Sequence, residues 1–154
     1  MKQLIFKSSM FRMIAALCVL SLTALTSTSA PNPNVERMIV SIPFEFSVSG
    51  KRLPAGDYTV KRDSSMGGAY IIQSRDGKTG VITLTSGRLE ARGTQAAAKL
   101  VFNNYRHQYF LSQIWTGDVG KQVPQSRAER ALKQELASVT TDDAQPRQIT
   151  LLAR

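Results

Sequence analysis

The clearest pattern in the sequence is an apolar residue at every second position over residues 38–48. The apolar residues of this period are Met38, Val40, Ile42, Phe44, Phe46 and Val48. A period of two places these side chains on one face of a β-strand, so the segment predicts a strand with one buried face. Pro43 cannot donate a hydrogen bond to a neighbouring strand, and we therefore expect a sheet edge or a bulge at this residue.

Further short strands are predicted after this run, separated by turns rich in glycine, proline and aspartate. They cover residues 57–62, 69–74, 79–85, 97–102 and 108–116. The tetrapeptide 75–78 contains Asp-Gly between two apolar runs, which indicates a β-hairpin. Residues 103–107 predict a longer hairpin connection, and residues 86–95 are expected to be a loop. The pattern predicts a mainly β fold, a small antiparallel β-sandwich or barrel of six to seven strands.

One C-terminal α-helix is expected over residues 126–139. Ser126 and Glu129 match a capping box, in which each side chain accepts a hydrogen bond from the backbone amide of the other residue. The residues of the apolar face are Ala128, Ala131, Leu132, Leu136 and Val139. A helix this short is marginal alone, so we expect this face to pack on the sheet. Residues 140–154 are expected to form a flexible tail, with a final edge strand as the alternative.

Residues 1–30 have the composition of a signal peptide. The segment contains no acidic residue, and its basic residues are Lys2, Lys7 and Arg12. Residues 13–25 are almost all apolar or small, which is shorter than the roughly 20 residues that span a membrane and suits a signal sequence. Cleavage is expected after Ser29 or after Ala30, with an uncleaved membrane anchor as the alternative.

Export to the periplasm or the cell exterior changes two properties of the chain. The only cysteine, Cys18, leaves with the signal, so the mature protein has no disulfide. The signal also removes three of the 20 basic residues, and with 17 against 11 acidic residues the net charge falls from +9 to +6. Residues 31–35 predict a linker to a β domain over 36–139. No transmembrane segment is expected after cleavage.

The pattern of reactive side chains does not indicate an enzyme. His107 is the only histidine, and no acid or nucleophile lies beside it in its predicted turn. One cysteine and one histidine support neither a structural zinc site nor a Cys/His pair. We therefore expect no metal, no cofactor and no catalytic residue. The alternative is a hydrolase that uses Glu45, on the polar face of the first strand, with an unidentified second acid.

Aromatic residues gather on one predicted hairpin, and they are Tyr105, Tyr109, Phe110 and Trp115. One interpretation is a stacking platform for sugars or single strands. Tyr109, Leu111 and Trp115 share one strand parity, however, so we expect them in the core. Phe110 and Ile114 have the opposite parity, and we expect the helix to cover them.

The basic residues of the mature chain are dispersed and form no run of the kind that binds nucleic acid, which is not an expected partner. Candidates for an anion-binding surface are Lys51, Arg52, Lys61, Arg62, Arg88 and Arg92. They belong to basic segments over 51–62 and 75–92. An anionic glycan or lipid of the cell envelope would be the electrostatic partner of these segments.

Five segments together resemble a family of short exported proteins found mainly in acidobacteria. They are IPFEFSV (42–48), LPAGDYTV (53–60), KLVF (99–102), YFLSQIW (109–115) and VPQSRAE (123–129). The resemblance implies export and a β fold, and it supplies no activity and no site residue. Such relatives commonly have Gly-Asp where this chain has Arg106-His107. The sequence thus predicts an exported, non-enzymatic β domain that serves as a binding or structural module of the cell envelope.

Overall fold

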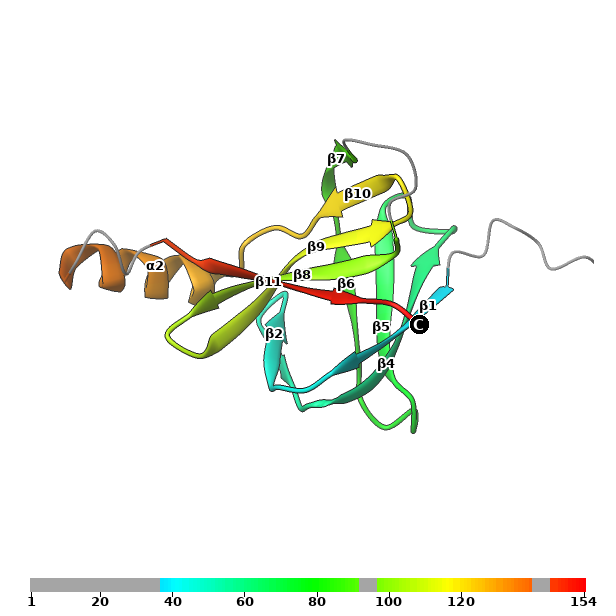
Figure 1. Cartoon of the computed structure of the whole chain (residues 1–154), viewed down its shortest axis with the longest axis horizontal. Coiled ribbons are helices and arrows are strands. Elements are labelled where there is room, and N and C mark those ends of the chain that lie inside the picture. Colours follow the sequence, from blue (N-terminus) through cyan, green and yellow to red (C-terminus); the bar gives the residue numbers. More distant parts are fainter. Residues whose placement is uncertain (1–36, 92–96, 140–144) are drawn as a thin grey trace, which may run out of the picture. The chain divides into compact units, whose positions relative to one another are not determined.

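The computed structural model describes residues 37–91, 97–139 and 145–154, which form eleven strands and one helix (Figure 1). The strands are β1 (Arg37–Ile42), β2 (Phe46–Val48), β3 (Lys51–Leu53), β4 (Gly56–Asp63), β5 (Ala69–Ser74), β6 (Gly80–Leu84), β7 (Ser86–Glu90), β8 (Lys99–Tyr105), β9 (Gln108–Thr116), β10 (Val119–Gln122) and β11 (Arg147–Leu152), and the helix is α2 (Arg127–Val139). The predicted β fold with a C-terminal helix is confirmed, with more strands than the six to seven expected. The predicted signal and linker lie outside the described residues.

The sheets lie on opposite sides of one core and are not closed into a barrel. One has the strand order β1-β4-β5-β6, and the other has the order β11-β8-β9-β10-β7, with β2 paired to both β3 and β9. The chain passes from one sheet to the other after β1, returns after β3 and crosses again after β6. Near the boundary between β1 and β11, the amide of Arg154 donates to the carbonyl of Ile39 at 2.9 Å.

Pro43 explains why the first periodic run forms two strands instead of one. β1 ends at Ile42 and β2 begins at Phe46, in different sheets. Proline has no N–H to donate, so the ladder of β1 is interrupted there. The buried face nevertheless continues across the bend, because Ile42, Phe46 and Val48 are each 1% exposed.

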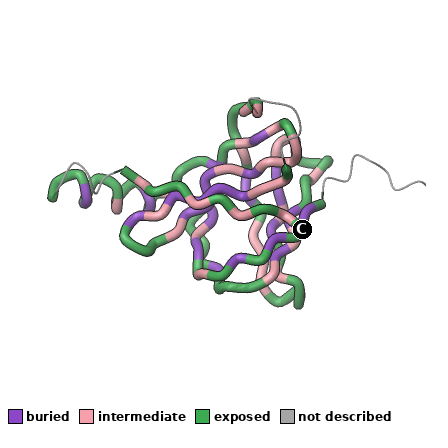
Figure 2. Tube along the Cα trace, viewed as in Figure 1, coloured by how far each residue is buried: buried purple, intermediate pink, exposed green. Residues whose placement is uncertain are grey.

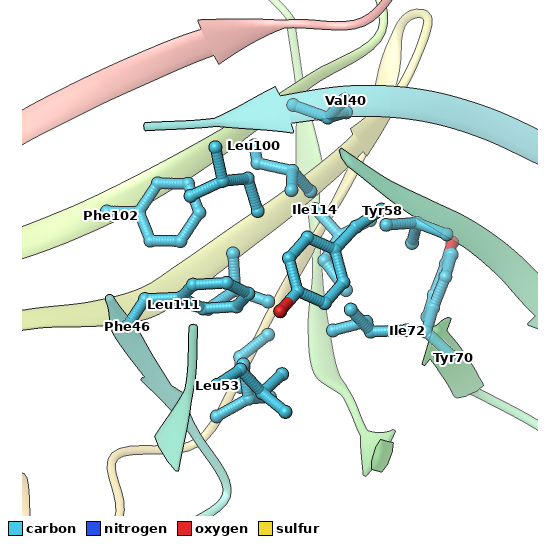
Figure 3. Close-up of a cluster of buried hydrophobic side chains, with 14 of the residues drawn as sticks. Val40, Phe46, Leu53, Tyr58, Tyr70, Ile72, Leu100, Phe102, Leu111 and Ile114 are labelled. Atoms are coloured by element: carbon cyan, nitrogen blue, oxygen red, sulfur yellow. The ribbon is translucent and has the colours of Figure 1, made fainter. Parts of the chain in front are cut away.

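The core between the sheets is apolar and rich in aromatic rings (Figures 2 and 3). Its buried residues are Met38, Val40, Ile42, Phe46, Val48, Leu53, Tyr58, Val60, Tyr70, Ile72, Leu100, Phe102, Leu111, Ile114 and Val123. The Phe46 ring packs edge-to-face on Tyr58 and on Phe102, with centroid distances of 5.2 and 5.5 Å. The Tyr58 hydroxyl donates to the Pro54 carbonyl at 2.7 Å, so the buried phenol is satisfied.

Two segments that lack a long apolar period form edge strands. Residues 86–90, expected to be a loop, form β7 and pair with β10. The flexible tail predicted over 140–154 is wrong for residues 147–152, which form β11 and pair with β8 along their whole length. Residues 140–144 lie outside the described ranges. Both strands pair on one side only, so pairing with a neighbour, rather than burial of a full face, holds them in place.

Helix α2 begins at the predicted capping box but buries a narrower face than expected. The Glu129 amide donates to the Ser126 hydroxyl at 3.1 Å, and the Ser126 amide bonds the Glu129 carboxylate. Leu132 and Leu136 pack against the β8–β9 hairpin. The other members of the predicted face, Ala128, Ala131 and Val139, are exposed. Within the described ranges, no helix is long and apolar enough to cross a membrane.

A bulge in β9 changes the predicted parity of the aromatic hairpin. Val101 pairs with Gln113 while Phe102 pairs with Leu111, so one strand carries an extra residue, Ser112. A bulge reverses the inside–outside alternation beyond it. Ile114 therefore enters the core instead of facing the helix, and Trp115, expected in the core, turns to the outer face. Phe110, before the bulge, packs against α2 as predicted.

Candidate anion-binding site

The basic candidates are distributed over both sheets. Lys51 and Arg52 lie on β3, and the Lys51 ammonium donates to the Gly80 carbonyl at 2.8 Å. Arg88 lies on β7, with its Nε 3.4 Å from the Glu90 carboxylate. Arg92 lies outside the described residues. β3 pairs with β2 and β7 pairs with β10, so the strand pairing does not bring Lys51 and Arg52 beside Arg88.

Lys61 and Arg62 are neighbours on β4, and successive strand residues point to opposite faces. Tyr58 and Val60 face the core, so Thr59 and Lys61 face outward. Lys61 and Arg62 therefore have different surroundings, although both are exposed. Lys61 lines a hollow that contains other cations.

We call this hollow, lined by Arg37, Thr59, Lys61, Gln73 and Arg75, the sheet hollow; its volume is about 450 Å³. Arg37 lies directly opposite Lys61 in the pairing of β1 with β4. Thr59 lies opposite Gln73 in the pairing of β4 with β5. The register therefore brings cations from separate strands around a hydroxyl and an amide. Arg37 was not among the sequence candidates, and Arg75 was included only as the first residue of the basic segment 75–92, because only the strand pairing places them beside Lys61.

Arg75 is positioned by the start of the β5–β6 turn. Its backbone amide donates to the Asp57 carbonyl at 2.9 Å, and its guanidinium lies 3.8 Å from the Asp57 carboxylate. The Arg75 side chain is 79% exposed, so this ion pair is weak and leaves the guanidinium accessible. In the same turn, the Ser74 hydroxyl and the Lys78 amide bond the Asp76 carboxylate and lower the pKa of Asp76.

A second basic hollow lies beside the turn between β8 and β9. This turn contains only two residues, Arg106 and His107, and corrects the longer connection that was expected. Their φ angles are 45° and 70°, which is the geometry of a type I′ turn. The lining residues are Asn104, Tyr105, Arg106, His107, Gln145, Pro146 and Arg147, and we call the space, of about 420 Å³, the hairpin hollow.

Glu45 and His107 line a smaller hollow of about 210 Å³ together with Arg52. The Glu45 carboxylate lies 3.3 Å from Arg52 Nε and is 60% exposed. The lining, as far as the described residues show, contains no second carboxylate, whereas glycoside hydrolysis uses two. The described part of the chain also contains no group of three metal-ligating side chains.

Glu129 is a buried carboxyl group whose burial the sequence did not indicate. It is 3% exposed, and its Oε1 accepts from the Asn103 amide at 2.9 Å and from the Tyr105 hydroxyl at 3.5 Å. Burial raises the pKa of Glu129 despite these donors. Burial, together with the nearby Glu129 carboxylate, raises the pKa of Tyr105 to about 12. The Glu129 carboxyl group therefore links α2 to β8 through hydrogen bonds, and this role is structural.

The aromatic residues do not assemble a stacking platform. Tyr105 and Phe110 are buried, and Tyr109 stacks on Phe44 at a centroid distance of 3.9 Å. The Trp115 indole donates to the Gln113 side chain at 2.8 Å, and the Lys99 ammonium lies 4.9 Å from its centroid. Each of these rings is therefore either buried or in contact with another side chain of the protein.

No protein-family model, curated protein or solved structure matches the chain. The resemblance to exported acidobacterial proteins therefore stays a hypothesis. Among the sequence candidates in the described residues, Lys61 has the most basic surroundings, since Arg37 and Arg75 line the sheet hollow with it.

Proposed function

We propose that the chain is an exported, non-enzymatic β domain of the cell envelope, and that it binds anionic groups of a glycan or lipid in the sheet hollow. The observation that carries the proposal is the direct pairing of Arg37 with Lys61 across two strands. Arg75 lines the same hollow from the end of β5. The proposal keeps Lys61 as the central residue among the sequence candidates.

The pairing of Arg37 with Lys61 is electrostatically unfavourable in the free protein. Like charges directly opposite each other on neighbouring strands are destabilising. A bound oxyanion would offset this repulsion and would accept charge-assisted hydrogen bonds from the guanidinium groups. Thr59 and Gln73, opposite each other between the cations, supply a hydroxyl and an amide as further donors.

The surroundings of the sheet hollow suit a large ligand that approaches an open surface. Ile39 is 41% exposed and lies opposite Thr59, and Ile82 is 52% exposed and lies on the same face. Aliphatic side chains beside cations can contact the carbon skeleton of a sugar or lipid while the cations contact its charge. The net charge of +6 expected for the mature chain favours attraction to anionic polymers over a distance.

The test compares two neighbouring residues that carry the same charge. Lys61→Gln removes a cation from the sheet hollow, and Arg62→Gln removes one from the opposite face of the same strand. We expect Lys61→Gln to weaken retention on phosphatidylglycerol vesicles or on polygalacturonate about five-fold, since a basic residue near an anionic surface contributes about 1 kcal/mol. Arg62→Gln should have a much smaller effect.

Salt provides the second arm of this experiment. Retention of the unsubstituted protein should fall steeply as salt is raised, because exposed charges are screened. Retention that is insensitive to salt would contradict the proposal. Equal losses for Lys61→Gln and Arg62→Gln would show a diffuse charge effect instead of a site at the sheet hollow.

A further inference from the structure

The β8–β9 turn places two long polar side chains where glycine is the favourable residue. Arg106 and His107 both have left-handed backbone angles, 45° and 70°. Residues with a Cβ are strained in this region, and type I′ turns favour Asn-Gly. The β5–β6 and β9–β10 turns do use glycine at such angles, at Gly77 (φ 73°) and Gly117 (φ 75°). The strained turn is held in part by Asn104, whose side-chain oxygen accepts from the His107 amide at 2.9 Å.

The side chains of this turn line the hairpin hollow together with a second arginine. Arg147, at the start of β11, lies directly opposite Asn104 in the strand pairing. Arg106 and Arg147 thus reach one hollow from two elements that are distant in the sequence. Asn104 and Gln145 add amide groups to the lining of the hollow.

We infer that the hairpin hollow is a second binding site, separate from the sheet hollow, for the oxyanion of a small ligand, either a carboxylate or a phosphate. Guanidinium groups bind both anions through paired hydrogen bonds. The volume of about 420 Å³ lies within the range of small-molecule sites and fits one acidic sugar. Backbone strain concentrates where a particular side chain is needed for binding. The positive-φ turn is then the cost of presenting Arg106 and His107 at the hollow.

The test uses two probes, galacturonate and inorganic phosphate, titrated into the full mature chain by calorimetry. Arg106→Gly removes one guanidinium and also relieves the backbone strain. We expect it to weaken probe binding about ten-fold or more, as loss of a charged hydrogen bond does, and to raise the melting temperature. Arg147→Gln should weaken probe binding to a similar extent without raising the melting temperature. Opposite changes in binding and stability at Arg106 would not arise from a turn with a purely structural role.

Arg88→Gln serves as the control. It removes an exposed arginine on β7 that lines neither hollow, so this variant should bind the probes like the unsubstituted protein. The inference is supported if the unsubstituted protein binds one of the probes and both Arg106→Gly and Arg147→Gln lose that binding. Binding of galacturonate would indicate a carboxylate ligand, and binding of inorganic phosphate would indicate a phosphate ligand. The inference is overturned if the unsubstituted protein binds neither probe, or if Arg106→Gly and Arg147→Gln bind as it does.

Discussion

The indole ring of Trp115 lies against the backbone of Gly120 on the neighbouring strand. The two residues are directly opposite each other in the pairing of β9 with β10. A Cβ atom added to Gly120 would come within 2.7 Å of the ring atoms Cδ2 and Cε2. The ring thus covers a strand position that has no side chain of its own, which explains how a tryptophan on the outer face of the sheet is partly buried.

Gly120→Ala should destabilise the protein through this contact. Gly120 does not have a left-handed backbone angle, so the cost comes from displacement of the ring, and we expect about 1–3 kcal/mol. Chemical denaturation followed by tryptophan fluorescence measures both the stability and the displacement. Gly67→Ala is the matched control, because a Cβ there meets nothing within 4 Å. An equal effect of the two substitutions would contradict the ring contact.

Trp115→Ala distinguishes a partly buried ring from a core ring. Burial between Gly120 and Lys99 leaves part of the indole exposed. We therefore expect a loss of about 1–2 kcal/mol, less than full burial of a large side chain contributes. Urea denaturation followed by circular dichroism gives the value. A loss of about 3–5 kcal/mol would indicate the core position first expected from the sequence.

Leu136→Ala should loosen the contact between α2 and the β8–β9 hairpin. Leu136 is 4% exposed and packs with Tyr105 and Phe110, so we expect a loss of about 2–4 kcal/mol. Val139 is 67% exposed on the same helix, and Val139→Ala should change stability by less than about 0.5 kcal/mol. Thermal denaturation of the two variants provides the comparison. Similar losses would mean that α2 buries the wider face predicted from the sequence.

Glu129 should give the protein a stability that depends on pH. Burial raises its folded-state pKa above the ordinary value of 4.5, so the folded protein binds a proton more tightly than the unfolded chain does. The stabilisation from this proton is fully present below pH 4.5 and is lost as pH rises through the raised pKa. Glu129→Gln keeps an acceptor for Asn103 and should remove this decline.

Urea denaturation at a series of pH values from 4 upward measures the effect of Glu129. The stability of Glu129→Gln relative to the unsubstituted protein should increase with pH. Glu135→Gln removes an exposed carboxylate from the same helix and should leave the decline in place. Parallel pH profiles for the unsubstituted protein and Glu129→Gln would rule out the effect.

Much of the local structure was predictable because it depends on neighbouring residues. The apolar period from Met38 to Val48 specifies a strand face, and Pro43 interrupts it by lacking an amide donor. The capping box at Ser126 specifies the start of α2 through bonds that span three residues. The Asp-Gly turn between β5 and β6 is likewise local.

Features that depend on cross-strand partners were not predictable in this way. The extra residue at Ser112 reverses the alternation beyond it, and neither its own side chain nor its neighbours mark the bulge. β11 was expected only as the alternative to a flexible tail, because its pairing with β8, far away in the sequence, holds it in place. The burial of Glu129 likewise depends on Asn103 and Tyr105 of β8.

By itself, the sequence determined that the chain forms amphipathic strands with a capped helix, since period, turn chemistry and capping act over a few residues. Only the tertiary structure decided which charges meet. Arg37, Lys61 and Arg75 are far apart along the chain, and the register of β1, β4 and β5 places them around one hollow. Side-chain proximity in a β fold depends on strand pairing, which is a property of distant segments rather than of any one of them.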